Sequence, residues 1–322
     1  MENNSAADSV DTKVEIKPKS PTLDEGEDES PDKKLCTSQL LPSIDLHSSD
    51  YSMNHEKRGL AIIFNHFKFD SQKYKNSQRY GTKKDRERLE KTFELLDFDV
   101  QVHNDRNRLE ITKILQDAAA IDHRNNDCIV VVVLSHGNKG RLEALDGTYD
   151  VDELLEPILN SQSLIGKPKL FFIQACRGVK GDPGFAATAK DQLCPFLSGG
   201  DMMDSTEFRP QYFKIPSTAD LLVMYATYEG CFAWRNPDMG SYFIQALCDE
   251  FDANGAKDDL LRLLTGVNRK VAFQFQSNVP GSSKLNAMKQ MPSIVSMLTK
   301  TLNFTVKGTT STRSENCTTS GY

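Results

Sequence analysis

The chain has 322 residues, 38% of them hydrophobic and 26% charged, which suits one or two globular domains with additional tails. Residues 1–50 hold 12 acids and 5 lysines (net −7), whereas the remainder holds 33 acids and 34 bases (net +1). A near-neutral folded part argues against a nucleic-acid-binding protein. No run of 18 apolar residues occurs, so we expect no membrane association.

The amino terminus has neither a basic start nor an apolar run, and the seven cysteines show no paired metal-ligand spacing. These features predict a reducing, cytoplasmic location with free thiols and no bound metal.

Residues 1–50 are rich in Asp, Glu, Ser, Lys and Pro, and poor in apolar side chains. Such a segment cannot bury enough surface to offset its chain entropy, so it predicts a disordered acidic leader. The Ser/Thr-rich segment 308–322 predicts a disordered tail.

The intervening chain alternates apolar runs with segments of helical period. Strands are expected at 60–64, 98–102, 129–134, 170–173, 221–226 and 294–298, and helices at 83–96, 109–121, 152–159, 242–251 and 258–275. In the second helix, Ile111, Leu115, Ala118 and Ile121 should share one face. This alternation predicts an α/β fold: a mostly parallel sheet of about six strands with helices on both faces.

Residues 179–210 contain Gly, Pro, Asp and Ser without a sustained period, which predicts a loop. A loop of about 30 residues inside a compact domain is uncommon unless it is functional.

Two of the expected core strands are followed by reactive side chains. Cys176 comes just after 170–173, and His136 just after 129–134. The carboxyl ends of parallel strands are where ligands bind in open α/β sheets. Either residue alone is more often structural, but together, each beside a glycine, they indicate a cysteine nucleophile assisted by a histidine.

The segment Gln174-Ala175-Cys176-Arg177-Gly178 resembles the active-site pentapeptide of the caspases, and Ser135-His136-Gly137 resembles their histidine motif. The resemblance covers roughly residues 51–307 and is closest to executioner caspases with a short prodomain, including those of insects. It implies a prodomain at 1–50, a large-subunit part at 51–178, a cleavable linker at 179–211 and a small-subunit part at 212–307.

The resemblance also implies the chemistry. The Cys176 thiolate would attack the scissile carbonyl, and His136 would supply the proton to the leaving amine. The backbone N–H groups of Gly137 and Cys176 would form the oxyanion hole. No cofactor is expected.

Caspases cut after aspartate, and arginine suits a carboxylate because it binds it bidentately. Residues 79–85 (Arg-Tyr-Gly-Thr-Lys-Lys-Asp) are similar to the family's Arg-x-Gly-Thr-x-x-Asp loop, which makes Arg79 one donor. Residues 233–236 (Ala-Trp-Arg-Asn) are similar to a second motif, which makes Arg235 another. Gln174 would contribute an amide.

By the same resemblance, the backbone of Arg235 pairs with an extended substrate strand. Phe232 and Trp234 wall the pocket for the residue before the aspartate, and Asn236 helps to bind the aspartate three residues further upstream. Tyr242 stands where executioner relatives usually have Trp, so the outer pocket departs from their pattern.

The chain contains Asp-x-x-Asp sequences of the form that executioner caspases cut. One ends at Asp204 before Ser205 in the linker, and another ends at Asp11 before Thr12 in the leader. Asp182 is a poor candidate because Pro183 lacks the amide N–H. These sequences predict a zymogen that is activated by cleavage after Asp204.

The family usually forms a homodimer of processed subunit pairs, here through the strand near 294–298. Expected partners are protein substrates with Asp before the scissile bond, an upstream initiator caspase and inhibitors of the IAP type.

Two alternatives stay open. A catalytically silent homologue that regulates active caspases would tend to lose the cysteine, the histidine or a pocket arginine, all of which are present. A metacaspase that cuts after Arg or Lys would need acidic residues at positions 79 and 235.

Overall fold

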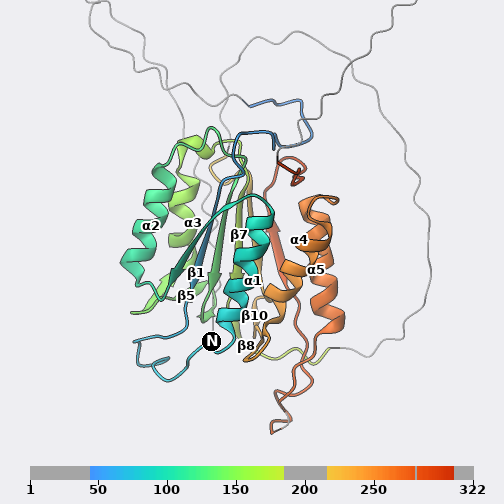
Figure 1. Ribbon diagram of the computed structural model, residues 1–322. Coiled ribbons are helices and arrows are strands. Elements are labelled where there is room, and N and C mark those ends of the chain that lie inside the picture. The colour runs from blue at the N-terminus through green and yellow to red at the C-terminus, as the bar shows by residue number, and fades with distance from the viewer. Residues whose placement is uncertain (1–43, 185–215, 280, 308–322) are drawn as a thin grey trace, which may run out of the picture. The chain divides into compact units, whose positions relative to one another are not determined.

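The apolar runs of the sequence form a six-stranded sheet (Figure 1). The computed structural model describes residues 44–184, 216–279 and 281–307. From one edge to the other, the strands are β13 (Ser293–Ser296), β9 (Leu221–Tyr225), β7 (Lys169–Gln174), β3 (Ile129–Leu134), β1 (Leu60–Asn65) and β2 (Asp99–Asn104). Neighbours pair in parallel except β13, which is antiparallel to β9. The predicted α/β fold with a mostly parallel sheet is confirmed.

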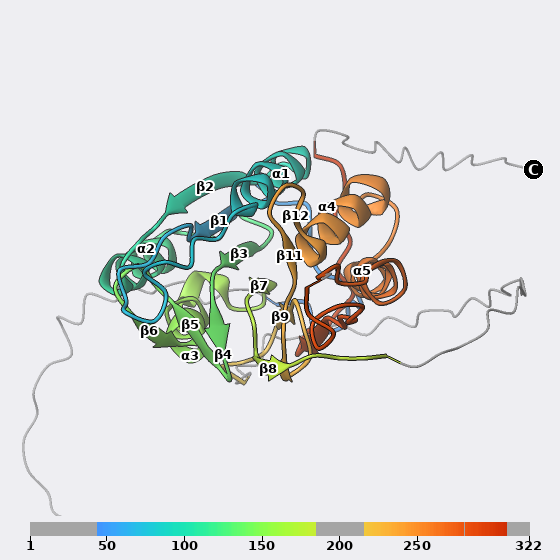
Figure 2. The ribbon, with the colours of Figure 1, turned by 90° about the horizontal axis from the view of Figure 1, so that it is seen from below.

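Helices cover both faces of the sheet, as Figure 2 shows from the end. One face carries α1 (Thr82–Leu95), α4 (Tyr242–Asn254) and α5 (Leu260–Gln274), and the other carries α2 (Arg108–Ala120) and α3 (Val151–Leu159). Successive residues of a strand point to opposite faces, so each central strand contributes to both cores. This is why β1, β3 and β7 are buried along their whole length and are apolar apart from residues at the ends of β1 and β7.

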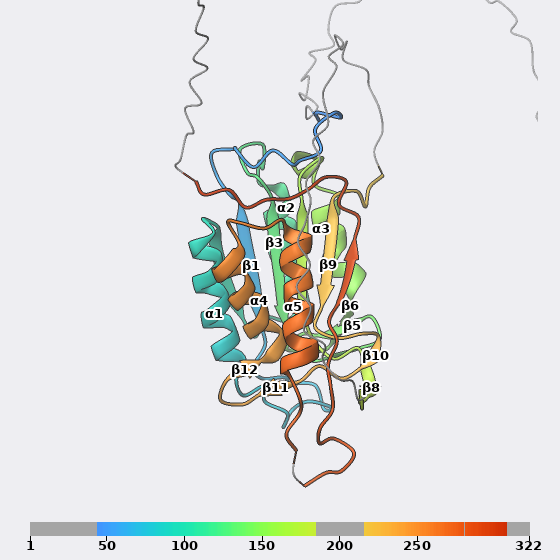
Figure 3. The same cartoon turned by 90° about the vertical axis from the view of Figure 1, so that its right-hand side faces the viewer.

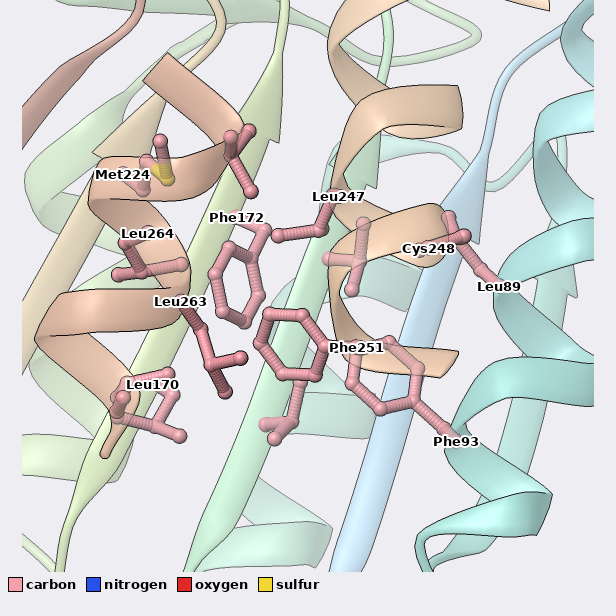
Figure 4. Packing of buried hydrophobic residues seen from close by; sticks show 14 of the residues in the cluster. Leu89, Phe93, Leu170, Phe172, Met224, Leu247, Cys248, Phe251, Leu263 and Leu264 are labelled. Atoms are coloured by element: carbon pink, nitrogen blue, oxygen red, sulfur yellow. The ribbon is translucent and has the colours of Figure 1, made fainter. Parts of the chain in front are cut away.

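Aromatic rings fill the core beneath α1 and α4 (Figure 4). The ring of Phe172 on β7 lies 6.0 Å from that of Phe251 on α4 and 6.4 Å from that of Phe93 on α1 (centroid distances). The Phe172–Phe251 pair is edge-to-face, an arrangement that aromatic quadrupoles favour. The contacts tie helices from two distant parts of the chain to one strand.

The second helix is shorter than its apolar pattern predicts. It begins at a capping box formed by Asn107 and Glu110, and it ends at Ala120, where Ile121 turns to an extended backbone. Ile111, Leu115 and Ala118 are buried as expected, but Ile121 is 43% exposed. The prediction for Ile121 was wrong because the residue lies past the last turn.

Three small sheets were not predicted. They are β4 (Gly137–Asn138) with β5 (Arg141–Glu143) and β6 (Thr148–Asp150), β8 (Gly178–Lys180) with β10 (Gly230–Cys231), and β11 (Arg235–Asn236) with β12 (Gly240–Ser241). β8, β10 and the β11–β12 hairpin lie at one end of the molecule, below the carboxyl ends of the central strands (Figure 3). The segment from residue 179, predicted to be a loop throughout, therefore begins as a strand.

The chain between Gly184 and Pro216 connects two strands that are direct neighbours. β7 and β9 pair in parallel over five residues, from Lys169 with Leu221 to Ile173 with Tyr225. The structure therefore keeps the predicted large-subunit and small-subunit parts in one continuous sheet.

The predicted leader, linker and tail fall largely outside the described residues. The described end of the leader, residues 44–50, lies against the folded part, where Asp50 forms a bridge with Thr301. Among the helices that the structure describes, none is both long and apolar enough to cross a membrane.

Candidate active site

The parallel pairing of β3 with β7 brings the two reactive side chains together. Leu134 is paired with Gln174, and His136 and Cys176 each come two residues later. Ser135 N donates to Gln174 O (3.1 Å), so the two chains stay in register past the strand ends. The adjacency that the two strand ends predicted is therefore present.

Gly137 lies where a side chain would not fit. A Cβ atom there would stand 2.8 Å from Arg141 O, 3.0 Å from the Cβ of Ala175 and 3.0 Å from Cys176 O. Glycine therefore lets the backbone that follows His136 pass directly beside the backbone of Cys176, as an oxyanion hole built from both residues requires.

His136 is held by the loop between β1 and α1. Its Nε2 lies 3.1 Å from Ser77 O. Its ring stacks on Tyr74, with centroids 4.5 Å apart and an angle of 11° between the planes, and also contacts Phe69 at 4.9 Å. The Ser77 carbonyl fixes which nitrogen carries the proton, which leaves Nδ1 as the free base.

Sequence patterns did not identify this support for the histidine. Ser77 acts through its carbonyl, which every residue has, so no residue type signals it. Tyr74 and Phe69 lie in a polar loop without period, where aromatic residues carry no positional information.

The thiol of Cys176 is half-buried and points at the small-subunit part of the chain. Its Sγ accepts a hydrogen bond from Ala233 N (3.4 Å). No hydrogen bond joins Sγ to the His136 ring in the part of the chain that the structure describes. Such catalytic contacts commonly tighten only when substrate binds.

Burial dominates the electrostatics of both catalytic groups. It raises the pKa of the Cys176 thiol, although Ala233 N–H and the charges of Arg79 and Arg235 oppose the rise. It also lowers the pKa of His136 to about 4; the Ser77 carbonyl opposes this shift, and the two arginines add to it. The resting pair is therefore a thiol and a neutral imidazole at neutral pH.

Arg79 is fully buried, and only one of its three guanidinium nitrogens has a hydrogen-bond partner among the described residues. Nη1 donates to His66 O (3.0 Å) and to Thr82 Oγ1 (2.8 Å). Nε and Nη2 have no partner among the described residues, and neither does the buried Oε1 of Gln174. Nε and Nη2 form the edge of a guanidinium that binds a carboxylate bidentately.

Arg235 comes from β11 and meets the Arg79 loop. Its Nε donates to Tyr80 O (2.7 Å). In the described residues, neither Arg79 nor Arg235 forms an ion pair with a carboxylate, whereas most of the other arginines do. The structure thus brings Arg79 and Arg235 close enough for their charges to act on each other and on Cys176, with neither arginine in an ion pair among the described residues. The substrate-binding roles predicted for Arg79, Gln174 and Arg235 stay predictions.

The predicted outer-pocket residues fall into two groups. Phe232 and Trp234 are in contact, with ring centroids 6.0 Å apart, and Trp234 N donates to Gln290 Oε1 (2.7 Å). Tyr242 instead lies against Phe275, with centroids 4.0 Å apart. The roles predicted for these residues in substrate binding stay predictions.

Asn236 shapes the turn of the hairpin. Its Oδ1 accepts from the backbone N–H groups of Asp238 (2.8 Å) and Met239 (2.9 Å), so its carbonyl oxygen is already occupied. The predicted cleavage sites, Asp11 and Asp204, lie outside the described residues.

Comparison with known proteins identifies the family. The protein family described as "Caspase domain" matches residues 58–303 of this chain. The chain is 43% identical over 263 residues to Caspase-1 of Drosophila melanogaster, covering 81% of this chain and 77% of the relative. It is 37% identical to Caspase-7 of Gallus gallus, covering 87% and 86%.

A solved structure agrees. Caspase-1 from Spodoptera frugiperda superposes with a TM-score of 0.74 at 40% identity, covering 83% of this chain and 97% of that one. Two of these relatives come from insects, as the resemblance suggested. The chain therefore belongs to the caspase family: it is a cysteine-type endopeptidase of the executioner kind, which acts in apoptosis.

Proposed function

We propose that the enzyme cuts proteins after aspartate in Asp-x-x-Asp sequences. The observation that carries this proposal is the buried Arg79, whose Nε and Nη2 have no partner in the described residues. Leaving two charged donors buried and unpaired is costly, and a substrate carboxylate would satisfy both at once. A neutral side chain would leave them unpaired, which favours strong selection for the acid.

In the proposed reaction, Cys176 Sγ attacks the main-chain carbonyl carbon of the substrate aspartate. The thiol proton passes to His136, which then protonates the leaving amine, and water cleaves the acyl-enzyme. The oxyanion would be held by the N–H groups of Gly137 and Cys176. Because burial favours a thiol and a neutral imidazole in the free enzyme, the proton transfer is placed after substrate binding in this mechanism.

The edge of the sheet supports a homodimer. β13 ends the strand order, and its Val295 is 46% exposed. A second copy could add its own β13 there and extend the sheet, which would cover an edge that otherwise offers unpaired backbone groups.

We further propose that the protein is a cytoplasmic zymogen, cut by an initiator caspase and restrained by IAP-type inhibitors. The Asp-x-x-Asp sequence that ends at Asp204, between the two parts of the chain, supports activation by cleavage.

Replacing Arg79 by Lys should lower kcat/KM for an Asp-x-x-Asp peptide by at least about a hundredfold, because a point charge replaces a bidentate donor pair. A fluorogenic peptide assay measures this change. Arg108→Lys, at the start of α2 and paired with Glu153, is the matched control and should act like the wild type. Normal activity in Arg79→Lys would contradict the proposed pocket.

Alkylation of Cys176 by iodoacetamide should accelerate continuously from pH 6 to beyond pH 9. Only the thiolate reacts, and the raised thiol pKa keeps its fraction small at neutral pH. Mass spectrometry of the Cys176 peptide gives the rate for this thiol alone. A plateau that begins near pH 6 would instead demonstrate a preformed thiolate–imidazolium pair.

Asp204→Ala should stay uncut, while the unmodified chain yields a fragment that begins at Ser205, alone or after addition of an initiator caspase. Intact-mass spectrometry distinguishes these products. The Cys176→Ala variant separates self-processing from cleavage by the added protease. Maturation of Asp204→Ala at the usual rate would place the activating cut elsewhere.

The Cys176→Ala protein, cut at the linker, should elute with the mass of two large-subunit and small-subunit pairs. Val295→Arg should halve that mass, because the charge would be buried at the shared edge. Multi-angle light scattering reads both masses. If the cut Cys176→Ala protein with Val295 unchanged elutes with the mass of a single subunit pair, the dimer is ruled out.

A further inference from the structure

The proposed aspartate pocket is assembled from two parts of the chain that cleavage at Asp204 would separate. Arg79 lies in the loop before α1, on one side of that position, and Arg235 lies on β11, on the other. The pocket therefore depends on whatever holds the β11–β12 hairpin against the Arg79 loop.

Asp85, in the first turn of α1, makes that connection. It is fully buried. Its Oδ1 accepts from Ser241 N (2.7 Å) and Gln245 Nε2 (3.0 Å), and its Oδ2 accepts from Ser241 Oγ (2.5 Å). All three donors belong to the small-subunit part, so one carboxylate on α1 receives the end of the hairpin and the start of α4.

The surrounding glycines show how close the two parts approach. Gly240 has φ +93°, and a Cβ atom there would lie 2.3 Å from Asp85 Oδ1. On the other strand of the hairpin, where Asn236 is paired with Gly240, a Cβ atom on Gly81 would lie 2.3 Å from Asn236 O. Both strands of the hairpin therefore pack directly against the segment from Arg79 to Asp85.

The charge of Asp85 also acts on the two arginines without occupying them. Burial lowers the pKa of both Arg79 and Arg235, and Asp85 opposes the shift in each case. Because its oxygens are engaged by Ser241 and Gln245, Asp85 offsets the buried positive charge and leaves the Nε and Nη2 donors of Arg79 to the substrate.

We propose that Asp85 is a positioning residue that assembles the aspartate pocket across the two parts of the chain, holding the hairpin of Arg235 in register with Arg79. The proposal rests on the proposed specificity for aspartate. Asp85 is the final residue of the segment that resembles the family's Arg-x-Gly-Thr-x-x-Asp motif. The proposal gives this aspartate a role distinct from that of Arg79, the first residue of the motif.

The test compares Asp85→Asn with Asp252→Asn in the processed enzyme. Asp252 on α4 also bridges to α1, through Arg88 Nη1 (2.5 Å) and Thr92 Oγ1 (2.8 Å), but further from the pocket. Each substitution thus removes one carboxylate that links the same two helices. Steady-state kinetics use two peptides that differ only in Asp or Glu before the scissile bond.

For Asp85→Asn, we expect KM for the Asp peptide to rise about tenfold or more, and the preference for Asp over Glu to fall. Iodoacetamide should alkylate Cys176 at the wild-type rate, because that reaction does not use the carboxylate pocket. Asp252→Asn should lower the melting temperature and keep the wild-type KM and Asp/Glu preference. A purely structural role for Asp85 would change the active fraction but not that preference.

The outcomes separate the two proposals. A wild-type enzyme that does not prefer the Asp peptide overturns the proposed function. A wild-type preference that survives in Asp85→Asn with unchanged KM overturns the role of Asp85. If Asp85→Asn does not fold, Gln245→Leu removes one donor and keeps the carboxylate; raised KM with normal alkylation then supports the proposal, and unchanged KM overturns it.

Discussion

The parallel hydrogen bonding of β3 to β7 is the constraint on which the active site depends. Its register sets Leu134 opposite Gln174, and both chains leave the sheet from that pair. The strand pairing alone therefore brings Cys176 and His136 near each other, because a buried core of Val, Ile and Phe side chains holds the two strand ends side by side. The flanking loops then add the support for the imidazole and the access for substrate.

The pocket arginines are a local cost that the fold tolerates. Removing a guanidinium from water without a partner is expensive, yet Arg79 is fully buried, and two of its three guanidinium nitrogens have no partner among the described residues. The cost is partly offset by His66 O, by Thr82 and by the field of Asp85. The unpaired Nε and Nη2 donors of Arg79 remain available to a ligand. The fold therefore carries a local destabilisation that ligand binding would relieve.

Much of this architecture follows from the sequence alone. The continuous apolar runs predict the central strands because both faces of the sheet are covered, and the helical period predicts the five α-helices of the described residues to within a few positions. The pentapeptide and the histidine motif located Cys176 and His136. The motif at 79–85 located Arg79, but it gave no indication that the arginine would be buried.

The remaining features arise from contacts that residue types do not encode. The strands β4, β8, β10, β11 and β12 are only two or three residues long, so they have no periodicity to detect. Ser77 contributes only its backbone carbonyl. The side-chain amide of Gln290 accepts from Trp234 N and donates to Ala226 O, but in the sequence this residue looks like any surface glutamine. Ile121 fits the period of α2, but the helix stops before it.

Because β7 and β9 are neighbours in the sheet, cleavage of the chain between them would leave the two parts held together by the core of the domain. The chain between Gly184 and Pro216 joins two strands that are hydrogen-bonded along their length, and α4 and α5 from the second part bury their apolar faces on strands of the first. A break in that connection severs none of the strand pairings that the structure describes. The two fragments would then be an obligate heterodimer whose interface is a domain core, held by the same apolar contacts that folded the single chain.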